Sequence, residues 1–295
     1  MKDHLIKATA NGVRMYAAVT TKLVNEGIRR HQCNPVAAAA LGRTMTGALL
    51  MAANLKNKEC ITVKFNGDGP LGNVVADASP DGYVRGYVDH PYVDLPLNNG
   101  KIAVGEGIGA GIVSVTRFTG LRDTVTGTCR IATGEIAEDL TRYLYVSEQT
   151  PSSIGLGVLV GKDLKAIAAG GFFIQPMPGL ADEVLTKLEK NLAELRPVSE
   201  MIGEGLDGRG IITEALKGFD VNYFETIDLI FKCQCSKQRI EGILMSLNEK
   251  ELESLVEDGH AEVCCHFCGE KYQFNKDELV ALINVSKELK KRKNK

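Results

Sequence analysis

The sequence predicts an α+β protein with a β-rich N-terminal domain over residues 1–178, a helical linker over 179–231 and a small C-terminal domain over 232–295. Three observations support this division. Strand-like segments alternate with turn signals in the first half, helical periodicity begins near residue 179, and paired cysteines lie near the C-terminus. The length of 295 residues also favours about two folding units.

The first half reads mostly as antiparallel sheet with a few packed helices. Asn11-Gly12 lies between LIKATA and VRMYAAVT and predicts a tight hairpin. Further strands are expected in CITVKFN, GNVVADAS, YVRGYVD, GIVSVTRF, VTGTCRIA, IGLGVLVG and KAIAAGGFFI. Asn34 and Pro35 can open a helix that continues into VAAAALGRTMTGALLMAANL, and GEIAEDLTRYLYVSEQ reads as a second helix. The small residues of the first helix predict close packing against a sheet, and a membrane or ligand role stays open.

The linker has an apolar helical face but a glycine-rich second half. ADEVLTKLEKNLAEL places Val184, Leu185, Leu188, Leu192 and Leu195 on one face before Pro197. The next stretch, SEMIGEGLDGRGIITEALKG, contains five glycines. Each interior helical glycine costs about 0.8–1 kcal/mol relative to alanine, so these helices should be marginal without tertiary support. The sequence therefore predicts a segment that is only conditionally folded.

Composition and termini indicate a soluble, cytoplasmic protein. The chain is 44% hydrophobic and 24% charged with a net charge of -2, which argues against disorder and against nucleic acid as the default partner. The N-terminus MKDHLIKATANG lacks the apolar core of a secretory signal. No uninterrupted apolar run approaches the roughly 18 residues that a membrane span needs.

Near the C-terminus, Cys233 and Cys235 form a CxC pair, and Cys265 and Cys268 form a CxxC pair beyond the intervening stretch 236–264. In a reducing compartment such paired cysteines are typical of metal ligands or redox-active thiols. Two short pairs brought together by a fold make the tetrahedral Cys₄ site that zinc prefers. We therefore expect a small zinc domain with one Zn²⁺ per chain in the reduced form.

The zinc site has two interpretations, an inert structural site and a redox switch. Zinc keeps its sulfur ligands as thiolates, which oxidants attack, and each short pair has a disulfide partner next to it. Oxidation could therefore close Cys233–Cys235 and Cys265–Cys268 and remove every ligand from the metal. Structural zinc can supply about 10–16 kcal/mol of apparent folding energy. A module of this size has only about 3–5 kcal/mol from its own core, so losing the metal should unfold it.

Other candidate groups carry weaker signals. Cys264 and His266 could ligate zinc in principle, but we expect both to be bystanders because of their placement beside and inside the CxxC turn. The isolated cysteines Cys33, Cys60 and Cys129 read as small buried residues. The basic tail of residues 287–295 holds six Lys or Arg, but residues 233–295 carry eleven basic and eleven acidic residues. A solvated helix end is the preferred interpretation of this tail.

No catalytic motif is evident. GEGIGAG does not fit GxGxxG, and the P-loop, GxSxG and HExxH patterns do not occur. The five histidines are scattered through the chain. The sequence therefore predicts a protein that is not an enzyme.

The cysteine spacing and CHFCGEKYQF resemble the zinc domain of the heat-shock protein 33 family of redox-regulated bacterial holdase chaperones. The resemblance continues along the chain in NEGIRRH, AALGRTMTGALLMA, GPLGNVVADA, SEQTPSSIGLGVLV and AAGGFFIQPMPG. Cys233, Cys235, Cys265 and Cys268 fall on the family's zinc and redox positions. Cys264 and the three cysteines of the first domain depart from its pattern and obscure which disulfides form.

The resemblance implies an ATP-independent holdase that binds unfolding client proteins after oxidation releases zinc and unfolds the linker and zinc domain. It also implies a homodimer in the active form. Two alternatives stay open from the residues: a zinc-ribbon protein that binds nucleic acid or the ribosome through its basic tail, and a thiol-disulfide oxidoreductase using Cys265 and Cys268. The client-binding surface, the order of disulfide formation, the activation temperature and the dimer geometry are not predicted.

Overall fold

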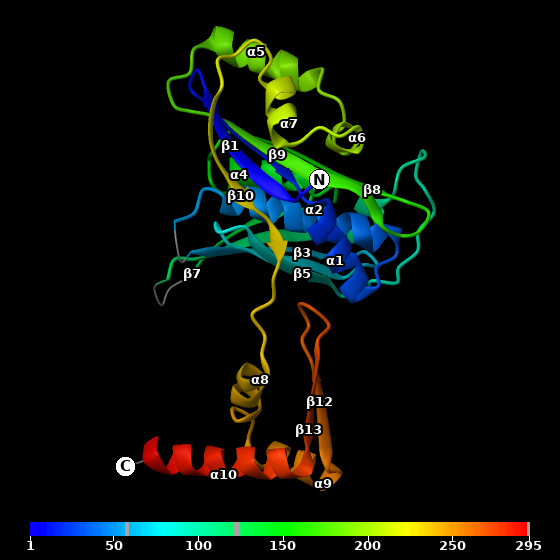
Figure 1. Cartoon of the computed structure of the whole chain (residues 1–295), viewed down its shortest axis with the longest axis vertical. Coiled ribbons are helices and arrows are strands. Elements are labelled where there is room, and N and C mark those ends of the chain that lie inside the picture. The colour runs from blue at the N-terminus through cyan, green and yellow to red at the C-terminus, as the bar shows by residue number, and fades with distance from the viewer. Residues whose placement is uncertain (57–58, 121–123, 294–295) are drawn as a thin grey trace. The chain divides into compact units, whose positions relative to one another are not determined.

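The computed structural model describes residues 1–56, 59–120 and 124–293 and confirms an α+β fold. The chain divides into two compact units, Met1–Lys232 and Cys233–Lys295 (Figure 1). The predicted boundary between residues 178 and 179 falls inside the first unit and stays a prediction.

The first unit is built on two mainly antiparallel sheets. Sheet A has the spatial order β10 (Asn222–Asp228), β1 (His4–Ala10), β2 (Val13–Val19), β9 (Ala166–Pro176) and β8 (Ser153–Val160). Sheet B has the order β11 (Ile230–Phe231), β5 (Tyr83–Val88), β4 (Asn73–Ala78), β3 (Cys60–Gly67), β6 (Gly111–Phe118) and β7 (Thr124–Arg130). The predicted hairpin joins β1 to β2, with Asn11 and Gly12 at φ 46° and 81°, the left-handed backbone that such a two-residue turn requires.

Helix α2 (Pro35–Ala52) packs against strands of both sheets and forms the centre of this unit. It buries every residue except Pro35 and Arg43. Small residues permit the close packing: a Cβ on Gly47 would lie 2.6 Å from Leu140 Cδ1. The helix is long and apolar enough to cross a membrane, but 89% of its span is buried inside the protein. The small-residue run therefore serves as a core helix.

The other helices within residues 1–178 are α1 (Thr21–His31), α3 (Val104–Ile108) and α4 (Ala137–Val146). The buried Asp3 carboxylate accepts hydrogen bonds from the Lys22 and Leu23 amides at 3.1 and 2.6 Å, so it caps the start of α1 from a distant part of the chain. Asp139, also buried, accepts from the amides of residues 132–134 and orders the turn before α4.

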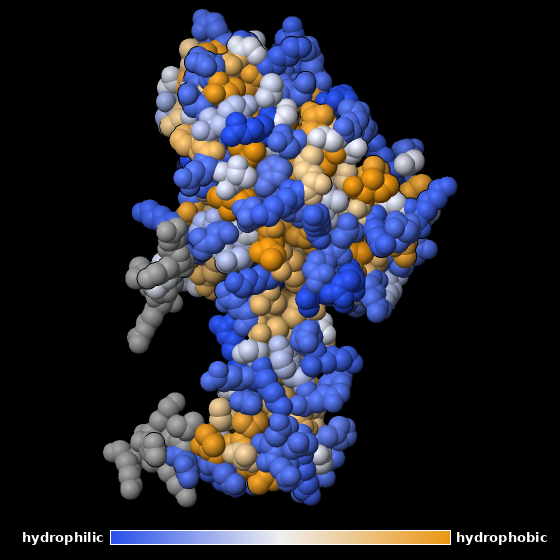
Figure 2. Space-filling view, viewed as in Figure 1, coloured by the Kyte–Doolittle hydropathy of each residue, from blue (hydrophilic) through white to orange (hydrophobic). Residues whose placement is uncertain are grey.

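Helices α5 (Asp182–Ala193), α6 (Val198–Gly203) and α7 (Gly208–Ala215) cover one face of sheet A. They share one apolar cluster with the sheet. The sheet contributes Ile6, Ala8, Ala10, Val13, Met15, Ala17, Val19, Ala168, Phe172 and Ile174. The helices and adjoining residues contribute Leu188, Val198, Met201, Ile202, Ile211, Ile212, Ala215 and Leu216. Figure 2 shows hydrophobic residues (orange) interspersed among hydrophilic ones (blue) on the visible face of this part of the molecule.

Polar contacts between the sheet and the linker are few by comparison. The His4 imidazole Nε2 accepts a 3.0 Å hydrogen bond from the Gly208 amide, and the hydroxyls of Thr213 in α7 and Tyr223 in β10 are 2.9 Å apart. The linker helices are therefore held to sheet A mainly by apolar contacts.

The expected helical linker is not helical throughout. Residues 222–228 form β10, which pairs antiparallel with β1 at the edge of sheet A, and Ile230–Phe231 pairs in parallel with β5 of sheet B. Thr226 and Ile227 are β-branched, and every residue of the run NYFETID is exposed except the partly exposed Tyr223 and Ile227, as on an edge strand. The end of the predicted linker thus connects the two sheets.

The second unit contains α8 (Lys237–Leu244), α9 (Glu249–Asp258), the hairpin of β12 (His260–Cys264) and β13 (Lys271–Asn275), and α10 (Lys276–Lys293). Its predicted caps are confirmed: the Ser236 side chain accepts from the Arg239 amide, and Asn248 with Glu251 forms a capping box. A small core joins these elements through Ile240, Leu244, Leu252, Ala261, Phe274 and Leu279. Of the basic tail, residues 294–295 lie outside the described residues.

The docking of the linker helices on sheet A can be tested at Ile211, which is fully buried in their shared cluster. Ile211→Ala should lower the free energy of opening of α5–α7 by about 2–5 kcal/mol, because it removes buried methyl groups and leaves a cavity. Amide hydrogen exchange across residues 182–215 measures this change. Glu189→Ala, at an exposed position of α5, is the control and should leave exchange as in the unmodified chain. Unchanged exchange in Ile211→Ala would contradict the packing described.

Candidate metal centre

The four paired cysteines come together in the second unit. Cys233 and Cys235 lie in the segment that leads into α8, and Cys265 and Cys268 lie in the turn between β12 and β13. Their sulfur atoms all lie within 4.8 Å of one another. Close sulfur–sulfur contacts join Cys233 to Cys265 at 3.7 Å and Cys235 to Cys268 at 3.3 Å. Two segments that are well separated in the sequence thus present their thiols to one point.

Local backbone geometry positions each pair. In the β12–β13 turn the Cys265 carbonyl accepts from the Cys268 and Gly269 amides at 3.3 and 2.8 Å, and the Cys265 amide donates to Glu270 O at 2.8 Å. Gly269 has φ 70°, the left-handed conformation that closes this turn and that glycine adopts without strain. On the other side, the Ser236 cap starts α8 directly after Cys235.

The sulfur arrangement fits a tetrahedral cation. Zinc–sulfur bonds of about 2.3 Å in a tetrahedron place sulfurs about 3.8 Å apart, close to the separations in these two contacts. None of the eight cysteines, all of which lie within the described ranges, forms a disulfide. These four side chains are therefore able to hold a metal ion, and thiolate ligands favour Zn²⁺ over hard cations such as Mg²⁺.

Burial makes the Cys265 and Cys268 thiols poor acids by themselves. Desolvation raises the pKa of Cys265 and of Cys268, while the Phe267 and Glu270 amides, respectively, offset part of this effect. A divalent cation reverses the balance, because a coordinating thiol is deprotonated. Metal binding here must therefore release protons and weaken as pH falls.

Tyr272 is a contact of the site that sequence reasoning did not identify. Its hydroxyl donates to Cys235 Sγ at 3.1 Å from β13. A neutral donor of this kind stabilises a thiolate. An aromatic residue after the CxxC turn is visible in the sequence. Its contact with the Cys233–Cys235 pair, however, depends on the register of the β12–β13 hairpin.

The other candidate ligands lie apart from the cluster. Cys264 and His266 are exposed, and neither belongs to the group of converging sulfurs found among the described residues. Cys33 and Cys129 are buried and Cys60 is half-buried, and burial raises the pKa of the Cys33 thiol to about 12. Cys33 is therefore an unreactive core thiol, as expected.

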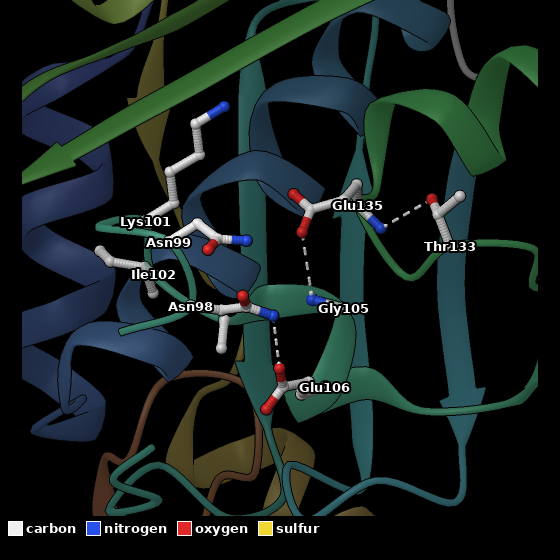
Figure 3. Close-up of a pocket in the computed structure, with 9 residues that line it drawn as sticks. Asn98, Asn99, Lys101, Ile102, Gly105, Glu106, Thr133 and Glu135 are labelled. Atoms are coloured by element: carbon white, nitrogen blue, oxygen red, sulfur yellow. Dashed lines mark hydrogen bonds between the residues drawn. The ribbon is translucent and has the colours of Figure 1, made fainter. Parts of the chain in front are cut away.

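A hollow of about 500 Å³ in the first unit gathers several polar residues (Figure 3). Its carboxylates are already engaged: Glu135 pairs with Arg43 at 2.7 Å and accepts from the Gly105 amide, and Glu106 accepts from the Asn98 amide group at 2.7 Å. These contacts hold α3 and the turn before α4 together. The hollow thus has a structural explanation in the contacts that line it.

Comparisons with known proteins agree over nearly the whole chain. The family model described as Hsp33 protein matches residues 3–275. The 33 kDa chaperonin of Bacillus subtilis is 48% identical over 285 residues, covering 95% of this chain and 98% of that protein. The 33 kDa chaperonin of Desulforamulus reducens is 44% identical, covering 96% and 98%. The crystal structure of the 33 kDa chaperonin from Thermotoga maritima superposes with a TM-score of 0.90 at 34% identity, covering 97% of this chain and 99% of that one.

Metal analysis of single variants tests the ligand assignment. The reduced protein should carry one zinc per chain, and Cys233→Ser, Cys235→Ser, Cys265→Ser and Cys268→Ser should each lose most of it, because a hydroxyl replaces a thiolate ligand. Cys264→Ser is the matched control beside a ligand and should retain full zinc. Loss of zinc in Cys264→Ser together with its retention in Cys268→Ser would show that the assignment is wrong.

Proposed function

Because this chain belongs to the Hsp33 family, we propose that it is a redox-regulated, ATP-independent holdase chaperone of the cytoplasm. A chaperone role agrees with the names of its relatives, which are called chaperonins and not enzymes. The observation that carries the proposal is the convergence of Cys233, Cys235, Cys265 and Cys268 in a small unit of their own. In the reduced form these cysteines hold one zinc ion.

The second unit depends on this site for its stability. Its apolar core is small, and domains of this size rarely obtain more than about 3–5 kcal/mol from a core alone. A structural zinc site is worth about 10–16 kcal/mol of apparent folding energy in small domains. Losing the ligands should therefore unfold residues 233–295.

Oxidation removes the ligands by disulfide formation. A peroxide takes two electrons from each thiolate pair, one S–S bond forms and the peroxide O–O bond breaks, and two protons complete two molecules of water in the case of H₂O₂. Two equivalents of peroxide thus convert four thiolates into two disulfides. Disulfide sulfurs carry no negative charge, and Zn²⁺ then dissociates.

We propose that the disulfides are Cys233–Cys235 and Cys265–Cys268. The two short sulfur–sulfur contacts instead join Cys233 to Cys265 and Cys235 to Cys268. All four sulfurs nevertheless lie within 4.8 Å of one another, so the folded geometry does not select a pairing. Once the unit loosens, chain connectivity decides, because residues two or three apart pay little loop-closure entropy. Peptide mapping of the oxidised protein distinguishes the two pairings.

The active surface lies under the linker helices. Helices α5–α7 cover a face of sheet A that includes Met15, Phe172 and Ile174. Their glycines make them weak helices, so they depend on this docking. When the zinc unit unfolds and the linker is released, both the sheet face and the apolar side of the linker become available to unfolding client proteins. Two such chains then associate as a homodimer.

Oxidation at raised temperature should release zinc and start suppression of client aggregation. The expected result is parallel growth of the signal of a chromophoric zinc indicator and loss of light scattering from a heat-denatured client. Cys129→Ser, which removes a buried thiol outside the site, should respond like the unmodified protein. Complete zinc release without any gain in holding activity would rule out the switch.

Removing the zinc unit should mimic oxidation. A chain ending at Lys232 keeps both sheets and the linker but lacks the second unit. We expect it to suppress client aggregation in excess reductant, where the full-length chain is inactive. The inert zinc-site interpretation instead predicts a soluble chain that holds client no better than the reduced full-length protein, even when amide exchange shows that its linker opens freely.

A further inference from the structure

The first unit also contains a cavity of about 230 Å³, remote in sequence from the zinc cysteines. It is lined by residues from β2 and β9 of sheet A, the C-terminal end of α2, β6 of sheet B, and the end of α4 with the turn that follows. Its polar wall contains two arginines, Arg14 and Arg117, which the topology brings together from different sheets.

The charges around this cavity do not balance. Arg117 pairs with Glu148 at 2.5 Å, and that carboxylate is the acidic group in the lining. Arg14 has no carboxylate within 4 Å among the residues that the structure describes, and its Nε donates to Gln175 Oε1 at 2.5 Å. Burial raises the pKa of the neighbouring Tyr16, so this phenol stays neutral and does not serve as a counterion. The cavity therefore carries an excess positive charge.

One buried hydrogen-bond donor of the arginines that line the cavity also lacks a partner. Arg117 Nε is buried without a partner, although buried N–H groups are normally satisfied. Gln175 is only 5% exposed, and its amide holds Arg14 across the β2–β9 pair, where the two residues are directly opposite. A guanidinium that lacks a counterion in a part-buried site costs free energy unless an anion completes it.

Contacts within the protein hold the surroundings of this cavity in place. Tyr16 stacks on Phe173 with ring centroids 5.6 Å apart and donates its hydroxyl to Asn54 Oδ1. The partial negative charge at the end of α2 is met by Lys7, whose Nζ donates to the Ala53 carbonyl at 2.7 Å. Fixed guanidinium groups match planar or tetrahedral oxyanions through paired N–H donors.

We propose that this cavity binds a small oxyanion, either a carboxylate or a phosphate group on a small molecule. The apolar part of the lining, which includes Met51, Leu144 and Phe173, would contact the body of that molecule. The volume is below the roughly 300 Å³ at which drug-sized sites begin, so the ligand is a small metabolite. The site neither uses the zinc cysteines nor depends on the redox state of the chain.

Titration of the reduced full-length protein tests the site, with inorganic phosphate in one arm and acetate in the other. Ionic strength is held constant with chloride, and calorimetry and the thermal unfolding midpoint are followed. We expect saturable binding of at least one of the two anions with a rise in the midpoint, and the stronger arm identifies the preferred group. Arg14→Met should weaken that binding at least about tenfold, the loss expected for one charge-assisted contact.

Arg130→Met is the matched control, because Arg130 is an exposed arginine on β7 outside the cavity and the substitution removes the same charge. It should bind the anion as the unmodified protein does. If Arg14→Met proves unstable, Arg14→Lys keeps the charge without the planar fork, and the side-chain amide resonance of Gln175 in the unmodified protein reports occupancy directly. The proposal is overturned if neither anion binds saturably, if Arg130→Met weakens binding as much as the Arg14 variants, or if the Gln175 resonance does not move.

Discussion

The C-terminal unit is organised around four sulfur atoms that lie within 4.8 Å of one another. Burial disfavours ionisation of the Cys265 and Cys268 thiols, and four thiolates at this separation repel one another unless a cation lies among them. The four sulfurs lie in the segment that leads into α8 and in the β12–β13 turn, and the unit that contains them has only a small apolar core. In the proposed function the unit is therefore stable only while its sulfurs are reduced and bound to metal, so that a single oxidation event controls the fold of the whole segment Cys233–Lys295.

The linker helices depend on their docking against sheet A. Its helices bury Leu188, Met201 and Ile211 against sheet A, so the docked state is well packed. Its glycines nevertheless keep the isolated helices weak. A segment that is stable only when docked can cover an apolar sheet face in one state and expose it in another. In the proposed function, the sheet remains folded while its cover is removed, since α2 holds both sheets from inside.

Features of the fold and of the cysteine site that depend on a short segment of sequence could be predicted. Asn11-Gly12 predicted the first hairpin, Ser236 and the Asn248–Glu251 pair predicted helix starts, and the cysteine spacing predicted the convergence of the sulfurs. Features that depend on long-range register were not predicted. Strand β10 pairs with β1 from a distant part of the chain, and Tyr272 reaches Cys235 only through the folded hairpin. The Arg14 and Arg117 cavity likewise forms only when the two sheets are in place.

In the proposed function, oxidation of the cysteine cluster uncovers sheet A while the sheets stay folded. Amide exchange of the full-length chain, followed during peroxide treatment at raised temperature, measures this most directly. We expect residues 182–215 and 233–293 to exchange like an unfolded chain once zinc is released, while β3 and β6 keep their protection. Full protection of residues 182–215 after complete zinc release would contradict it.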